Sequence, residues 1–123
     1  MLNLASSKKI YLYTPATDMR KGVNGLSGIV RGEFAADPTD GSMFVFINKR
    51  RSRMKILHFD DGGFWLYYRV LEAETFEMRT NPQQANYLTV DATELAMLLS
   101  GVSLAASGRR RKRFTPNQPE RAA

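Results

Sequence analysis

The 123-residue sequence predicts an α+β fold: an antiparallel β-meander of three to five strands, a glycine-rich helix on one face and a short C-terminal helix. The strands are indicated by three apolar segments rich in β-branched and aromatic residues, at positions 43–47, 54–59 and 64–71. The helices are indicated by apolar residues at three- and four-residue spacing over positions 18–34, and by a capping motif at 91–94.

The connections between the three apolar segments are typical of hairpins. Residues 48–52 are polar and cationic, and residues 60–63, Asp-Asp-Gly-Gly, tolerate the positive φ angles of a tight turn. Side chains alternate along a strand, so Phe64, Leu66, Tyr68 and Val70 share one face and Trp65, Tyr67, Arg69 and Leu71 share the other. One face is expected to lie under helices, whereas the other meets more of the chain or binds a partner.

The first predicted helix follows a short strand at residues 10–13, and Asp18 is expected to cap it. Four glycines lie in this segment: Gly22, Gly25, Gly28 and Gly32. Each costs about 1 kcal/mol relative to alanine in a helix interior. The helix is therefore predicted to depend on packing, and Gly22, Gly25 and Gly32 are expected to let its backbone lie close against the sheet.

The last part of the domain has weaker signals. Residues 75–78 are a candidate fourth strand, and residues 87–90 are a further short β-prone segment. Asp91 and Glu94 then form a predicted capping box for a helix that stops at Gly101.

The chain is predicted to hold a single domain at residues 10–103, between a flexible N-terminus at 1–9 and a disordered basic tail at 104–123. It has no cysteine, which excludes disulfides and thiol chemistry. No apolar run approaches the ~20 residues that cross a bilayer. Residues 1–9 carry their charge after a short apolar patch, so they are not expected to act as a secretory signal. A cytoplasmic protein without a cofactor is expected.

The formal net charge is +6, and most of it lies near the C-terminus. The last sixteen residues hold six of the 18 basic residues and one acid, which leaves +1 for the rest of the chain. A second basic cluster lies at the first hairpin, and phosphate backbones are the usual anionic partners of such clusters. The predicted DNA contacts are Lys49, Arg50, Arg51, Arg53 and Lys55 of the hairpin and Arg109, Arg110, Arg111, Lys112 and Arg113 of the tail. The alternative is a solubilising surface with a basic terminus.

Trp65, Tyr67 and Arg69 form the candidate partner interface. Together with Lys55 or Arg53 on a neighbouring strand, they contain the components of a base-stacking sheet. Core packing and protein interfaces are commoner for aromatic strands, so a protein interface is the preferred prediction.

His58 lies next to Asp60 and Asp61, which allows a metal or acid–base site because His58 and Asp60 share a strand face. Catalysis needs a third convergent group and a pocket, and the spacing supplies neither. The preferred interpretation is a hairpin turn preceded by an ordinary strand residue, with no catalytic or metal-binding residue.

Four ordered blocks hold unusual combinations of residues. They are Pro15-x-x-Asp18-Met19-Arg20-Lys21-Gly22-x-x-Gly25-Leu26, Gly41-x-x-Phe44-Val45-Phe46-x-Asn48-Lys49-Arg50-Arg51-x-Arg53-x-Lys55-Ile56-Leu57, Asp60-x-x-Gly63-Phe64-Trp65-Leu66-Tyr67-Tyr68-x-x-Leu71-Glu72 and Leu95-x-x-Leu98-Leu99-x-Gly101. Together, over roughly residues 10–102, they resemble the small accessory protein of the insertion sequence 66 family, which is called TnpB-type there.

The resemblance implies a protein encoded beside a separate, larger DDE-type transposase that carries the strand-cleaving carboxylates. Arg20 and Lys21 lie in the most characteristic block, and cations at the first turn of a helix oppose its dipole, which suggests a DNA contact. The alternative is that both side chains extend along the sheet edge.

The expected function is a non-catalytic transposition accessory factor. It is expected to bind DNA through the basic hairpin and tail, while the aromatic face holds the transposase or a second copy of the chain. Two alternatives are a protein adaptor that binds no DNA and a metal-dependent enzyme that acts on DNA through His58, Asp60 and Asp61.

Overall fold

The computed structural model describes residues 9–77 and 86–100 of the chain. The predicted flexible N-terminus, up to residue 8, and the predicted basic tail at 104–123 lie outside the described residues. Neither of the two described helices is long and apolar enough to cross a membrane.

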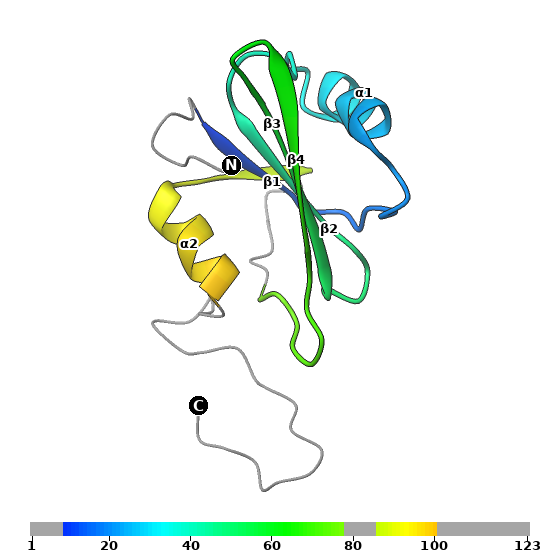
Figure 1. Ribbon diagram of the computed structural model, residues 1–123, viewed down its shortest axis with the longest axis vertical. Coiled ribbons are helices and arrows are strands. Elements are labelled where there is room, and N and C mark those ends of the chain that lie inside the picture. The colour runs from blue at the N-terminus through cyan, green and yellow to red at the C-terminus, as the bar shows by residue number, and fades with distance from the viewer. Residues whose placement is uncertain (1–8, 78–85, 101–123) are drawn as a thin grey trace, which may run out of the picture.

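One five-stranded sheet forms the centre of the molecule, and a helix packs on each of its faces (Figure 1). Its strands are β1 (Ile10–Tyr13), β2 (Met43–Ile47), β3 (Arg53–Asp60), β4 (Gly63–Val70) and β5 (Tyr87–Val90). Across the sheet they follow the order β4-β3-β2-β1-β5. The helices are α1 (Val23–Glu33) and α2 (Ala92–Ser100). The predicted α+β fold is confirmed.

The pairing of β1 differs from the predicted meander. Strands β2, β3 and β4 are antiparallel neighbours, as predicted, but β1 runs parallel to β2 and antiparallel to β5. A parallel pair needs a crossover connection instead of a hairpin, and α1 supplies it between β1 and β2. The meander is therefore limited to β2–β4, and β1 lies between the meander and β5.

The β3–β4 hairpin has the predicted tight turn. Asp61 and Gly62 have φ angles of 50° and 80°, the left-handed values that a two-residue type I′ turn requires. This turn pairs Asp60 with Gly63 at the hairpin end. It thereby determines which side chains of the two strands lie opposite each other.

Two hydrophobic clusters fill the space between the sheet and its helices. The cluster under α1 consists of Tyr13, Leu26, Val30, Phe34, Phe44, Phe46 and Leu57. The cluster under α2 consists of Ile10, Leu12, Met43, Val45, Ile47, Met54, Ile56, Phe76, Val90, Leu95 and Leu98. Every residue of β2 is buried because this strand is covered on both faces. Strand β4, by contrast, lies at an edge, and its side chains are half-buried or exposed.

The first helix begins later than predicted. Helix α1 starts at Val23, and its N-cap residue Gly22 makes no side-chain hydrogen bond to the helix. Asp18 lies before the helix and accepts hydrogen bonds from Arg20 instead of from helix amides. The prediction of an Asp18 cap is therefore wrong, and Arg20 and Lys21 do not oppose the dipole from within the first turn.

The glycines of α1 do not bring its backbone against the sheet, so that prediction is also wrong. A Cβ at Gly22, Gly28 or Gly32 would have no heavy atom of the surroundings within 4 Å. A Cβ at Gly25 would meet the Cβ of Lys21 at 3.1 Å. The helix packs on the sheet through larger side chains, because Leu26 and Val30 are fully buried.

The predicted fourth strand at 75–78 does not form over residues 75–77, and Met78 lies outside the described residues. Glu74 makes an isolated bridge, and Phe76 is fully buried in the cluster under α2. The backbone N–H of Phe76 donates to the carbonyl of Arg51 at 2.7 Å. The apolar residue thus contributes to the core from a loop.

The predicted capping box of the second helix is confirmed. The backbone N–H of Glu94 donates to Asp91 Oδ1 at 2.7 Å, and the backbone N–H of Asp91 donates to Glu94 Oε1 at 3.0 Å. These reciprocal bonds satisfy amides that have no partner inside the helix. The predicted stop at Gly101 lies outside the described residues.

Candidate nucleic-acid interface

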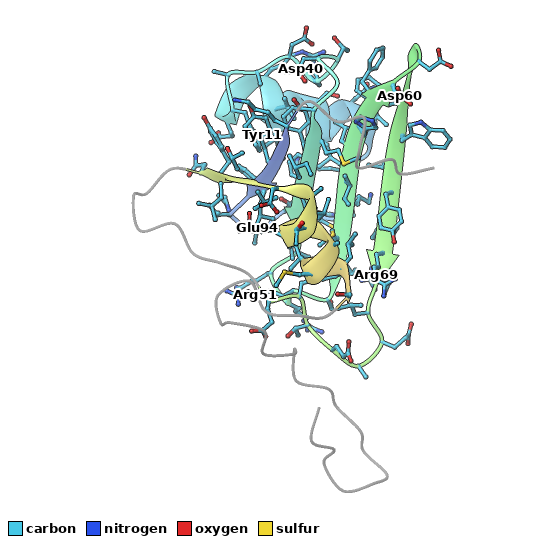
Figure 2. All side chains as sticks on the ribbon, turned by 90° about the vertical axis from the view of Figure 1, so that its left-hand side faces the viewer. Tyr11, Asp40, Arg51, Asp60, Arg69 and Glu94 are labelled. Carbon is cyan, nitrogen blue, oxygen red and sulfur yellow. The ribbon has the colours of Figure 1, made fainter. Side chains whose placement is uncertain are left out.

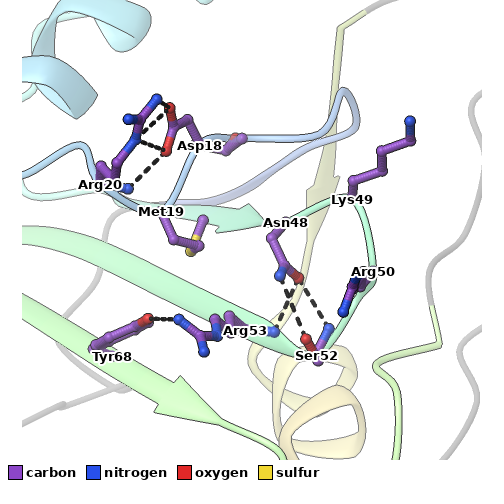
Figure 3. A pocket seen from close by; sticks show the side chains of 10 residues that line it. Asp18, Met19, Arg20, Asn48, Lys49, Arg50, Ser52, Arg53 and Tyr68 are labelled. Atoms are coloured by element: carbon purple, nitrogen blue, oxygen red, sulfur yellow. Dashed lines mark hydrogen bonds and ion pairs between the residues drawn. The ribbon is translucent and has the colours of Figure 1, made fainter.

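An open pocket of about 510 Å³ lies where two segments distant in the sequence meet beside β4 (Figure 3). The loop before α1, the β2–β3 hairpin and β4 supply its lining: Thr17, Asp18, Met19, Arg20, Asn48, Lys49, Arg50, Ser52, Arg53 and Tyr68. Four of the predicted DNA contacts are among these residues. Folding therefore gathers cations that are up to 33 positions apart in the sequence.

Asn48 organises the β2–β3 hairpin that carries three of these cations. Its backbone carbonyl accepts a hydrogen bond from the N–H of Arg51 at 3.0 Å, which closes a four-residue turn. Its side-chain Oδ1 accepts from the N–H groups of Ser52 and Arg53 at 2.9 and 3.0 Å. Arg51 takes a left-handed φ of 58°. The turn is thus closed by hydrogen bonds to one asparagine. Lys49 and Arg50, the two central residues of the turn, are exposed.

Asp18 and Arg20 shape the opposite wall of the pocket. The N–H of Thr17 donates to the carbonyl of Ile47 at 2.9 Å, which attaches this wall to β2. The Arg20 side chain donates from Nη2 to Asp18 Oδ2 at 2.7 Å, and the Arg20 backbone N–H donates to Oδ1 at 2.9 Å. These hydrogen bonds lower the pKa of Asp18 to about 2. The carboxylate is therefore ionised at neutral pH and keeps the guanidinium beside the pocket.

Lys55, a predicted DNA contact, supports this wall from inside the molecule. The residue is only 8% exposed, and its Nζ donates to the carbonyls of Met19 and Lys21, both at 2.8 Å. The same Nζ lies 4.9 Å from the ring centre of Tyr68. Lys55 therefore fastens the loop to β3 and holds its ammonium away from solvent.

Tyr68 forms the aromatic wall of the pocket. Its side chain is 44% exposed, and Arg53 Nη1 donates to its hydroxyl at 3.2 Å. Together with the ammonium of Lys55 over the ring, this hydrogen bond gives Tyr68 a defined orientation. An exposed aromatic ring beside several cations is an arrangement that binds nucleic-acid bases and phosphates.

The charge of the pocket is strongly positive. Four cations and one carboxylate line it, and that carboxylate, Asp18, is already paired with Arg20. Lys49 and Arg50 form no ion pair with any residue of the described ranges. Two further predicted contacts, Lys21 and Arg51, are exposed but do not line the pocket. The predicted tail contacts Arg109, Arg110, Arg111, Lys112 and Arg113 lie outside the described residues.

The predicted partner interface lies on the other face of β4, on the side of α2. Trp65 is 49% exposed, and Tyr67 packs against the cluster under α2. Arg69 is half-buried, and its Nε has no hydrogen-bond partner among the described residues. The prediction that Lys55 or Arg53 joins this face is wrong. Positions 53 and 55 pair with Val70 and Tyr68, whose side chains point to the α1 side.

His58 and the turn aspartates differ in their exposure. His58 is only 2% exposed, with Nδ1 3.4 Å from the carbonyl of Ser42. Asp60 and Asp61 are exposed, and Figure 2 shows Asp60 at the end of the sheet opposite to Arg51. Within residues 9–77 and 86–100, no three His, Asp or Glu side chains form a group that holds a metal ion.

Sequence reasoning missed Tyr68 and Thr17 as pocket residues. The two-residue turn after Asp60 pairs position 68 with position 55, so the hairpin register already brings Tyr68 beside a cation. Thr17 has no such local signal, because a hydrogen bond to the distant Ile47 determines its place.

Comparisons with known proteins agree with the family resemblance that the sequence shows over roughly residues 10–102. The uncharacterized proteins y4jC and y4hO of Sinorhizobium fredii (strain NBRC 101917 / NGR234) are similar to the chain over 102 residues. The first is 30% identical, over 83% of this chain and 86% of that protein, and the second is 28% identical, over 83% and 87%. No solved structure matches. Residues 8–109 match the family described as IS66 Orf2 like protein, so the chain belongs to this family of insertion-sequence accessory proteins.

Proposed function

We propose that the chain is a non-catalytic accessory factor of transposition that binds DNA and contacts the cognate transposase. DNA binding is assigned to the cations around the pocket, to Lys21 and Arg51 beside it, and to the basic tail. Such contacts are mostly to phosphates and therefore depend weakly on base sequence. A chain that holds both partners raises the concentration of the transposase at the DNA without chemistry of its own.

The observation that carries the DNA proposal is the convergence of cations from two distant segments. Isolated basic runs are usually solvated surface. Here Arg20, Lys49, Arg50 and Arg53 line one open pocket, and its single carboxylate is already paired. Two of these cations, Arg20 and Arg53, are oriented by hydrogen bonds inside the chain. Pre-oriented cations lose less side-chain freedom when they bind an anion, which favours binding.

Fluorescence anisotropy with a labelled element-end duplex and a scrambled duplex at several salt concentrations tests this proposal. The full chain is expected to bind both duplexes, with an affinity that falls steeply with salt because counterions are released from the phosphates. A double variant, Lys49→Gln with Arg50→Gln, should reduce the slope of log affinity against log salt by up to about 2. A chain ending at Ser107 should also give a shallower slope.

The matched control removes the same charge from elsewhere on the surface. Lys9 and Arg31 are exposed cations that do not line the pocket, so Lys9→Gln with Arg31→Gln should leave the salt slope nearly unchanged. Equal effects of the two double variants would mean that net charge alone attracts DNA. Absence of binding by the full chain at low salt would favour the adaptor function instead.

The transposase contact is assigned to the α2-side face of β4. Trp65 is the most exposed large apolar residue of the described ranges, and aromatic residues of this kind are frequent anchors in protein interfaces. Tyr67 and Arg69 continue this face along the same strand. Membership of the IS66 Orf2 like family supports a role in transposition, so the transposase is the partner that we propose.

Titration of the purified cognate transposase with the labelled chain measures this contact directly. Trp65→Ala should weaken binding by about 2 kcal/mol, as expected for an interface anchor, without changing the DNA affinity. Val70→Ala, at an exposed position on the opposite face of β4, is the control and should bind as the unchanged chain does. Loss of a dimer instead of the transposase complex would identify a second copy as the occupant of this face.

A further inference from the structure

The shape of the pocket fits a smaller ligand than a DNA duplex. A duplex presents its phosphates on a convex surface, whereas this site is a hollow of about 510 Å³. An open pocket of that volume has room for a ligand of nucleotide size. Part of one DNA strand can enter such a hollow only if a nucleotide leaves the base-paired stack.

The pocket wall also includes an exposed aromatic ring, which phosphate binding does not require. Tyr68 is 44% exposed although it is apolar over most of its area. Arg53 donates a hydrogen bond to its hydroxyl, and the ammonium of Lys55 lies over one side of its ring. The other exposed part of the ring is available to a planar group. Base stacking on tyrosine tolerates any of the four bases, because each has a π-face.

A buried polar atom of one lining residue has no hydrogen-bond partner among the described residues. Thr17 is 5% exposed and lines the pocket, and its Oγ1 makes no hydrogen bond with any described residue. A buried hydroxyl without a partner costs free energy, so it is usually paired in the functional state. Oγ1 itself is buried below the pocket surface, so a ligand with hydrogen-bonding atoms supplies that partner once the Thr17 side chain rotates toward the pocket.

We propose that the pocket binds one unpaired nucleotide, with its base against Tyr68 and its phosphate among the surrounding cations. The Thr17 side chain rotates so that Oγ1 bonds to a polar atom of this nucleotide. This inference rests on the proposed DNA binding and adds that the DNA is recognised at an unpaired position, such as a strand end or a nucleotide displaced from the duplex. The hydrogen bonds from Lys55 to the carbonyls of Met19 and Lys21 hold the loop before α1 in place before the nucleotide enters. The same ammonium lies over the ring of Tyr68, which forms the aromatic wall.

The test uses the full chain with two labelled DNAs of equal length, a blunt duplex and a duplex with a three-nucleotide single-stranded overhang. The overhang DNA should bind more tightly. Tyr68→Ala should lower its affinity about tenfold, the usual effect of removing one stacking aromatic ring. It should lower blunt-duplex affinity by a much smaller factor, because there only the hydrogen bond that orients Arg53 is lost. Trp65→Ala, which removes the exposed aromatic ring on the opposite face of β4, should change neither affinity.

A second variant separates binding from folding. Thr17→Val keeps the branched shape but removes the unpartnered hydroxyl, so thermal stability should stay the same or rise. Its affinity for the overhang should nevertheless fall on the order of fivefold. If Thr17→Val and Tyr68→Ala each bind the overhang DNA and the blunt duplex as tightly as the unchanged chain does, the nucleotide pocket is refuted while DNA binding stands.

A fluorescent base in the overhang identifies the source of the nucleotide. 2-Aminopurine should be quenched when it stacks on Tyr68, and Tyr68→Ala should abolish the quenching. Competition with free deoxynucleoside monophosphate distinguishes a strand-borne nucleotide, which it displaces only weakly, from a soluble nucleotide ligand, which it would displace at low concentration. If the unchanged chain binds neither DNA, the proposed function itself fails, which is a different result from equal binding of both DNAs.

Discussion

The two faces of strand β4 carry different chemistry although they alternate along one segment of eight residues. On the α1 side, Tyr68 lies beside Arg53 and the buried Lys55. On the α2 side, Trp65 is exposed, and no cation of the described residues is hydrogen-bonded to it. Its strand partner is the buried His58. The first combination suits a nucleic acid and the second suits a protein surface. The two binding functions that we propose are therefore assigned to opposite faces of one edge strand.

The largest expected effect comes from breaking the α1 side at Lys55. Lys55→Met removes two hydrogen bonds from a buried ammonium and leaves the carbonyls of Met19 and Lys21 without that donor. We expect a loss of about 2 kcal/mol in unfolding free energy, and a fall of roughly 10 °C in Tm by thermal denaturation. Lys49→Met, at the exposed hairpin tip, should leave Tm unchanged. An unchanged Tm in Lys55→Met would contradict the role of this lysine in attaching the loop before α1 to β3.

A smaller effect is expected on the α2 side at the capping box. Asp91→Ala removes the acceptor for the Glu94 amide and should cost about 1 kcal/mol in chemical denaturation. DNA affinity should not change, because α2 covers the face opposite to the pocket. Asp91→Asn keeps an acceptor oxygen and should retain most of the stability. A decrease in DNA affinity for Asp91→Ala would show that the two faces are coupled.

A gain in stability is expected in α1 on the pocket side of the sheet. Gly28 is exposed, and a methyl group there has no atom of the surroundings within 4 Å. Gly28→Ala should therefore raise the unfolding free energy by about 0.5–1 kcal/mol through reduced freedom of the unfolded chain. Gly25→Ala should gain less, since its methyl meets the Lys21 side chain at 3.1 Å. A loss of stability in Gly28→Ala would mean that this surface of α1 is covered.

The smallest effect concerns the pH dependence of the Asp18–Arg20 pair. The pKa of Asp18 is lowered from 3.8 to about 2, mainly by the hydrogen bond from the Arg20 side chain. A lowered pKa means that the pair stabilises the fold above pH 3.8 and loses this contribution as the pH falls through about 2. Carbon NMR of the Asp18 carboxyl should give a midpoint near 2, and Arg20→Gln should raise it. A midpoint near 3.8 in the unchanged chain would mean that the pair is absent in solution.

The sequence by itself determined the elements whose signals are local. The turn at Asp61-Gly62 requires positive φ and sets the β3–β4 register, and the capping box of α2 joins residues three positions apart. The alternation of the β4 side chains follows from strand geometry alone. These predictions are confirmed because the interactions that decide them lie within a few residues of one another.

Only the tertiary structure decided where distant segments meet. The parallel pairing of β1 with β2 depends on burial of both faces of β1, which no local pattern reveals. Asp18 was predicted to cap a helix, but the loop that contains it is attached to β2 through Thr17 and to β3 through Lys55. The pocket exists because these long-range hydrogen bonds hold the loop against the basic hairpin. Its lining could not be predicted from sequence spacing, since packing across more than 30 positions determines which cations become neighbours.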